Sequence, residues 1–157
     1  MKTLLSVTLL LVMASVSNCR ETPMAAAKSA SEIDAKEDIT ISYERGPCPF
    51  NCPVYSMTIR PDRSVEYEGI QSTRVLGKRT YKISVEAYKA IVNAVRQAKV
   101  EQLANEYKPV PGRDAGTAIL RVSWNGKTKQ IIHFLPSPEA PKELMDMEEA
   151  IVENAYP

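Results

Sequence analysis

The chain has 157 residues, 25% of them charged, and its 20 Lys and Arg nearly balance 19 Asp and Glu. A near-neutral chain without a basic run gives no support for a surface that binds nucleic acid or anionic lipid. Its length is enough for one domain with one hydrophobic core.

The N-terminus has the pattern of an export signal. Met1-Lys2-Thr3 supplies a charged start, and an apolar stretch follows over residues 4–14. This stretch is shorter than the roughly 20 residues of a membrane-spanning helix, and small residues come after it. We therefore expect a signal peptide over residues 1–18 rather than a spanning anchor.

The end of this leader resembles a bacterial lipobox, the site at which a lipoprotein is cleaved and acylated on its cysteine. The motif here is Val16-Ser17-Asn18-Cys19. It departs from the usual pattern at Val16, where Leu is common, and at Asn18, where Gly, Ala or Ser is common. The alternative is ordinary signal cleavage after Ser17 or Ala27, since small residues suit both sites. The pattern predicts lipidation of Cys19, with a secreted or free periplasmic protein as the alternative.

The residue after the cysteine bears on location. Arg20, rather than Asp, favours the outer membrane by the usual rule for such lipoproteins, which predicts a periplasm-facing protein of the bacterial cell envelope. One acylated N-terminus would tether the domain to a membrane that it does not cross. Residues 19–37 are small, polar and aperiodic, as expected for a flexible tether. Residues 38–157 remain as a single folded domain.

Export decides how the cysteines are interpreted, because paired thiols usually oxidise outside the cytosol. Cys19 is either acylated or removed, and Cys48 and Cys52 remain as an even pair joined by a turn. We expect a disulfide between them, which stabilises by about 2 kcal/mol in the chain-entropy model because its ring is short. Removal of residues 1–18 takes away one basic residue, Lys2, so the mature chain has equal numbers of bases and acids.

The domain has the pattern of four strands, a helix, a hairpin and a second helix. Alternating apolar and polar residues, typical of half-buried strands, occur in four early segments and on both sides of Asn125-Gly126. Asn-Gly strongly favours a two-residue hairpin turn because both turn positions need positive φ. Strands are expected over residues 39–45, 54–60, 65–70, 79–83, 117–124 and 127–135.

Two helices complete the set. Ser84 suits an N-cap and Glu86 a first turn, and apolar residues recur at helical spacing from Val85 to about Lys99. A looser apolar segment follows, and a second helix is expected over residues 139–154. These elements predict an α+β domain with a mostly antiparallel sheet of about six strands, in the order ββββ-α-ββ-α, and with both helices packed on one face.

With these elements in place, the chain resembles a family of bacterial envelope proteins described as domain of unknown function 6438 (DUF6438). The resemblance runs from about Ile39 to the C-terminus. It rests on a Cys-x-x-x-Cys-Pro-x-Tyr element, an Asp in a turn and a Val-x-Tyr-x-Gly strand. The matching residues are Cys48, Cys52, Pro53, Tyr55, Asp62, Val65, Tyr67 and Gly69. One departure is Arg63-Ser64, where the family has Gly, and it affects only the local turn type. The resemblance implies a compact exported domain of no known activity.

The function expected first is a non-catalytic binding or interaction domain whose partner is an envelope protein or a small ligand. The sequence contains no Gly-x-Ser-x-Gly elbow, phosphate-binding loop or His-Glu-x-x-His helix. No spacing singles out a pair of carboxylates for acid–base chemistry. We therefore expect neither a catalytic residue nor a cofactor.

A copper or thiol-redox site is the alternative hypothesis. The segment from Cys48 to Pro53 is similar to the Cys-Pro-x-x-Cys-Pro element of Sco-type copper chaperones, in which two thiolates and a distant His bind the metal. His133 would be that His. Against this, the Sco motif leads into a helix of a thioredoxin-like fold, whereas Val54 begins a strand-like segment. Zinc is weaker still, since Cys48, Cys52 and His133 give only three of the four ligands that a structural site needs.

Six aromatic residues could line a ligand groove. They are Tyr55, Tyr67, Tyr81, Tyr88, Tyr107 and Trp124. We expect most of them to be half-buried framework residues, because Tyr usually packs in this way. If one face is functional, the expected place lies between the cysteine turn and the Asn125-Gly126 hairpin.

Overall fold

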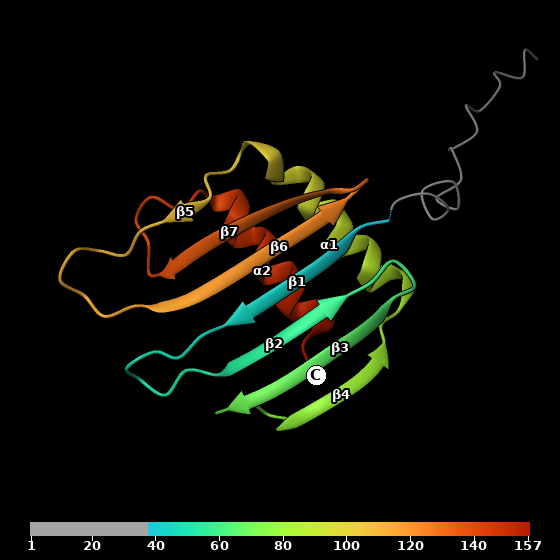
Figure 1. The fold of residues 1–157 in the computed structure, drawn as a ribbon, viewed down its shortest axis with the longest axis horizontal. Helices are drawn as coiled ribbons and strands as arrows, with labels where there is room; N and C mark the ends of the chain where they lie inside the picture. Colours follow the sequence, from blue (N-terminus) through green and yellow to red (C-terminus); the bar gives the residue numbers. More distant parts are fainter. Residues whose placement is uncertain (1–37) are drawn as a thin grey trace, which may run out of the picture.

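One sheet and two helices form the domain in the computed structural model, which describes residues 38–157. Both helices, α1 and α2, cover the same face of the sheet, and no described helix covers the other face (Figure 1). The predicted signal peptide, the acylation site and the tether lie outside the described residues. In chain order the elements are β1 (Thr40–Arg45), β2 (Val54–Ile59), β3 (Ser64–Gln71), β4 (Gly77–Lys82), α1 (Val85–Gln97), the short 3-10 helix η2 (Val100–Gln102), β5 (Glu106–Tyr107), β6 (Gly116–Trp124), β7 (Lys127–Leu135) and α2 (Lys142–Ala155).

The strands lie in the order β4-β3-β2-β1-β6-β7-β5. Every neighbouring pair is antiparallel except β5 and β7, which are parallel. The predicted α+β class, the antiparallel sheet and the placement of both helices on one face are therefore confirmed. The count is seven strands rather than about six, because β5 has two residues and is too short to show any alternation in the sequence.

The core lies between the sheet and the helices. Alternate residues of each central strand are buried on the helix side, as the period of two requires. The two helices contribute Ile91, Val92, Val95, Leu144, Met147 and Ile151 to the same cluster. The apolar stripes seen in the sequence are thus the faces that pack on the sheet.

Capping and turn residues determine where most of the helices and strands begin and end. The Ser84 hydroxyl caps α1 by accepting a hydrogen bond of 3.0 Å from the Ala87 amide, as predicted. Asn125 and Gly126 both have positive φ, which confirms the two-residue hairpin turn. Helix α2 begins at Lys142 rather than at residue 139, because Pro141 disfavours helical geometry at the residue before it.

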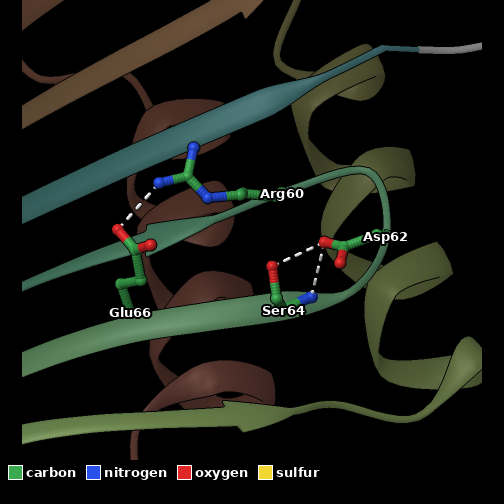
Figure 2. A network of polar contacts seen from close by, with 4 residues as sticks. All are labelled: Arg60, Asp62, Ser64 and Glu66. Carbon is green, nitrogen blue, oxygen red and sulfur yellow. Dashed lines mark hydrogen bonds and ion pairs between the residues drawn. The ribbon is translucent and has the colours of Figure 1, made fainter.

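The turn between β2 and β3 holds the departure from the family pattern (Figure 2). The Arg63 amide donates to the Arg60 carbonyl at 2.8 Å, and the Arg60 amide donates to the Ser64 carbonyl at 2.9 Å. Arg63 itself has φ of 68°. This is a three-residue hairpin loop whose last position is left-handed, where Gly is preferred. The Asp62 carboxylate accepts bonds from the Ser64 amide and hydroxyl, and Arg60 pairs with Glu66 at 2.7 Å, so polar side chains hold the turn.

We predict that Arg63→Gly stabilises the domain. A left-handed conformation costs a residue with a Cβ roughly 1–2 kcal/mol, part of which is offset by the greater entropy of Gly in the unfolded chain. The expected gain in unfolding free energy is about 1 kcal/mol, measured by urea denaturation. Arg63→Ala is the control and should give no such gain, because Ala keeps the Cβ. Equal effects of Gly and Ala would contradict this account of the turn.

Candidate functional site

A cleft opens between α2 and the ends of β1 and β7, with a cavity volume of about 420 Å³. Its polar base is formed by Tyr43, His133 and Glu148. Its sides and rim come from Arg45, Leu135, Met145, Glu149, Val152 and Glu153. The cleft therefore combines a buried polar base, apolar walls and charged groups at the edge.

Secondary-structure periods place these side chains. Tyr43 and Arg45 are two positions apart on β1, so both point to the helix side of the sheet, and His133 and Leu135 do the same on β7. The residues from α2 recur at spacings of three and four, which forms one stripe along the helix. Two strands and one helix that are distant in sequence thus converge on one cavity.

The base of the cleft is a hydrogen-bonded network. His133 Nδ1 lies 3.0 Å from Glu148 Oε1, and the Tyr43 hydroxyl donates to Glu148 Oε2 at 3.5 Å. Arg45 in turn donates to the Tyr43 hydroxyl oxygen at 3.4 Å. His133 is only 2% exposed and Glu148 only 6%. Since an ionised carboxylate is an acceptor only, Glu148 orients both neighbours as donors.

Tyr43 stays protonated in this setting. Burial raises the pKa of its hydroxyl to about 12, and the negative charge of Glu148 adds to the shift, while Arg45 opposes it. Because the folded-state pKa lies above the ordinary value near 10, the contribution of Tyr43 to stability is complete below about pH 10 and is lost as the pH rises through about 12. At neutral pH the hydroxyl is therefore a hydrogen-bond donor at the base of the cleft.

Sequence reasoning missed most of this network. It named His133 only as a candidate metal ligand, and it assigned no role to Tyr43, Arg45 or Glu148. A signal was present, however. Glu148 lies on the apolar stripe of α2, in line with Leu144, Met147, Ile151 and Ala155. A carboxylate on a core-facing stripe indicates a buried polar partner.

The cysteine turn joins β1 to β2 and contains the expected disulfide between Cys48 and Cys52, whose Cα atoms are 5.5 Å apart. The amides of Phe50 and Cys52 donate to Cys48 Sγ at 3.4 and 3.3 Å. Next to the turn, the Gly46 amide donates to the Thr117 carbonyl at 2.7 Å. The disulfide thus closes a turn that is also tied to β6.

The structure does not gather Cys48, Cys52 and His133 into one site. The two sulfurs bond to each other in the turn, whereas His133 pairs with Glu148 beneath α2. Across residues 38–157, no three His, Cys, Asp or Glu side chains are grouped so that they could hold a metal ion.

The six aromatic candidates do not form one groove. Tyr55, Tyr67 and Tyr107 are buried, and the other three are half-buried, as expected for framework residues. Hydroxyls of this set donate to main-chain carbonyls: Tyr67 to Val75, Tyr88 to Ile39 and Tyr81 to Ala155. The rings of Tyr55 and Tyr67 also pack with those of Tyr43 and Tyr156 in one cluster.

A functional face was expected between the cysteine turn and the Asn125-Gly126 hairpin, but the structure does not bring these two turns together. In the pairing of β1 with β6, Thr40 lies opposite Ser123 and Arg45 lies opposite Ala118. The hairpin and the cysteine turn are therefore at opposite ends of the sheet (Figure 1).

The fold and the cleft define a two-layer α+β domain with a ligand-sized cavity on its helix side. The family model described as "Domain of unknown function (DUF6438)" matches residues 39–155, and the chain belongs to this family. No curated protein matches the chain. In the part of the chain that the structure describes, neither helix has the length and apolar character needed to span a bilayer.

We predict that His133 and Glu148 are energetically coupled. His133→Leu should lower the unfolding free energy by about 3 kcal/mol, because it leaves a buried carboxylate without its partner. The double variant His133→Leu/Glu148→Leu should be more stable than His133→Leu alone, since it removes both polar groups. Urea denaturation of the wild type, both single variants and the double variant measures the coupling.

The control is the exposed pair Lys142 and Asp146 on the first turn of the same helix. Alanine substitutions there should show almost no coupling, because water screens exposed charges. Additive effects at His133 and Glu148 would contradict the proposed network.

Proposed function

We propose that this protein is an exported envelope protein, anchored by acylation of Cys19, whose domain binds a ligand without transforming it. The charged start, the apolar stretch and the lipobox-like motif support export and acylation. The disulfide supports an oxidising compartment, since such bonds are rare in the cytosol. The cleft beside α2 is the proposed binding site.

The charge of the cleft indicates the kind of ligand. Three carboxylates line the cavity, from Glu148, Glu149 and Glu153, whereas Arg45 supplies a single guanidinium. Arg45 is already engaged with the Tyr43 hydroxyl. An excess of negative charge attracts a cation, and partial exclusion of water strengthens that attraction.

The walls of the cleft indicate a second property of the ligand, an apolar part. Leu135, Met145 and Val152 line it with apolar surface, and Met145 is 46% exposed. Burial of an apolar stem against these side chains would be favourable. The ligand we propose therefore carries a cationic group on an apolar stem, as an alkylamine or a lysine side chain does. The juxtaposition of apolar walls and carboxylates in one cavity is the observation that carries this proposal.

The base of the cleft suits binding better than catalysis. Glu148 accepts from both Tyr43 and His133, so these groups hold one another in fixed positions. Such a network makes the cavity rigid, which reduces the entropy lost when a ligand binds.

Export and anchoring are tested in a bacterial host by fractionation and mass spectrometry. We expect the mature chain in the envelope fraction with a fatty-acylated Cys19, and Cys19→Ser should abolish acylation. Reduction should add two hydrogens to the mass of the mature chain, from Cys48 and Cys52. An unprocessed cytoplasmic chain with free thiols would contradict this part of the proposal.

Ligand class is tested with two probes of equal length and opposite charge, n-octylamine and octanoate, by calorimetric or NMR titration of the mature chain. We expect binding of the amine only. Glu149→Gln/Glu153→Gln should weaken it at least about fivefold, which corresponds to roughly 1 kcal/mol.

Glu143→Gln is the matched control, because Glu143 is exposed on the same helix and does not line the cleft. Equal binding of octanoate, or no loss in the double variant, would contradict a cation-binding cleft.

A further inference from the structure

Exposed apolar side chains gather at one end of the sheet. Among the described residues four large hydrophobic side chains are exposed, and three of them lie near the cysteine turn: Phe50 at 86%, Ile70 at 61% and Leu76 at 63%. The cysteine turn and the connection between β3 and β4 lie at the same end (Figure 1). We call this surface, with Arg74 and Arg79, the apolar tip.

The two segments of the apolar tip are held together. The Ser72 hydroxyl donates to the Asn51 side-chain carbonyl at 2.5 Å, which links the β3–β4 connection to the cysteine turn. Val54 lies opposite Gln71 in the β2–β3 pair, so Ile70 is at the same end as the disulfide. The disulfide fixes the turn that carries Phe50, and a fixed turn keeps this ring outside the core.

The β3–β4 connection is also ordered by its own contacts. The Val75 carbonyl accepts bonds from the Tyr67 and Thr73 hydroxyls at 3.1 and 2.8 Å. A Cβ at Gly69 would collide with the Val75 carbonyl oxygen, a backbone atom, so only glycine allows this close approach. Leu76 therefore stands on a well-defined turn with its side chain in solvent.

The charge around the apolar tip is positive. Arg74, Lys78 and Arg79 lie on the β3–β4 connection or early in β4, and one acid, Glu68, lies opposite Lys78 on β3. Lys78 pairs with Glu68 only at 3.9 Å, and most of the lysine side chain is exposed. Within residues 38–157 no ion pair is formed by Arg74 or Arg79. The sequence shows no basic run here, but the β3–β4 hairpin places these cations next to exposed apolar groups.

We propose that the apolar tip docks on the surface of an anionic phospholipid bilayer. Phe50, Ile70 and Leu76 stand on loops and a strand end, so they can enter the interfacial region without a complementary pocket. The nearby cations can pair with lipid phosphates and with the negative potential of such a surface. A protein partner would instead need a pocket shaped to these side chains.

The tether allows this docking, a point that rests on the proposed acylation of Cys19. The 18 residues from Arg20 to Glu37 can span roughly 60 Å when extended. Strand β1 separates Asp38 from the cysteine turn by roughly 20 Å. The membrane that holds the acyl chain is therefore within reach of the apolar tip.

The test is co-sedimentation of the chain from Arg20 onward, which has every described element but no acyl chain, with lipid vesicles. We expect binding to vesicles of phosphatidylcholine with 30% phosphatidylglycerol and little binding to pure phosphatidylcholine. Arg74→Glu and Arg79→Glu should each weaken binding about fivefold or more, and high salt should weaken it too. Phe50→Ser should weaken binding, whereas Phe50→Leu should retain most of it.

Lys127→Glu is the matched charge control, because Lys127 is exposed at the opposite end of the sheet and should have a small effect. Circular dichroism of each variant checks that it is folded. No binding to anionic vesicles, or equal loss from Lys127→Glu and Arg79→Glu, would overturn the proposal. Amine binding in the cleft should be unchanged in the tip variants, so failure here is distinguishable from failure of the proposed function.

Discussion

The pairing of β1 with β6 is the contact on which the rest of the structure depends. It joins the four-strand unit β1–β4 to the later β6–β7 hairpin, and it places Ile41 beside Val122 and Tyr43 beside Leu120 at the centre of the core. These partners are about 80 residues apart in sequence, so the contact has to offset a large loss of chain entropy. Burial of alternate apolar residues from both strands provides the free energy that offsets this entropy loss. The same burial fixes the register of the two strands. A slip of one residue would turn Tyr43 and its neighbours to the open face.

Two different surfaces follow from this arrangement. On the helix side, α2 covers β1 and β7 incompletely, and the cleft forms where the C-terminal ends of these two strands meet the helix. At the end of the sheet that carries the cysteine turn, short connections present apolar side chains that no element within residues 38–157 covers. The core thus explains the position of both surfaces. In our proposals the cleft takes a small cationic group, and the apolar tip sets how the domain lies on its membrane.

Much of the fold was predictable because its signals are local. Strand alternation, the Asn125-Gly126 turn and the Ser84 cap each depend on a few consecutive residues, and each is confirmed. Helix α2 begins later than its apolar pattern predicts, because Pro141 disfavours helical geometry at the residue before it. Strand β5 was missed because it exists only through pairing with β7. Most of the site was not predictable for a similar reason. In the sequence Tyr43 and Arg45 are ordinary strand residues, and only the packing of α2 on the sheet places Glu148 beside Tyr43.

The sequence by itself determined the order of the strands and helices other than β5, the apolar face of each, and a cysteine pair close enough in the chain to bond, since each of these rests on neighbouring residues. Only the tertiary structure decided which distant groups meet. It placed His133 against Glu148 rather than near the cysteines, set the Asn125-Gly126 hairpin at the opposite end from the cysteine turn, and gathered scattered cations beside exposed apolar side chains. The physical reason is that register and packing between strands far apart in the chain are fixed by burial of the whole core, which no short stretch of sequence records.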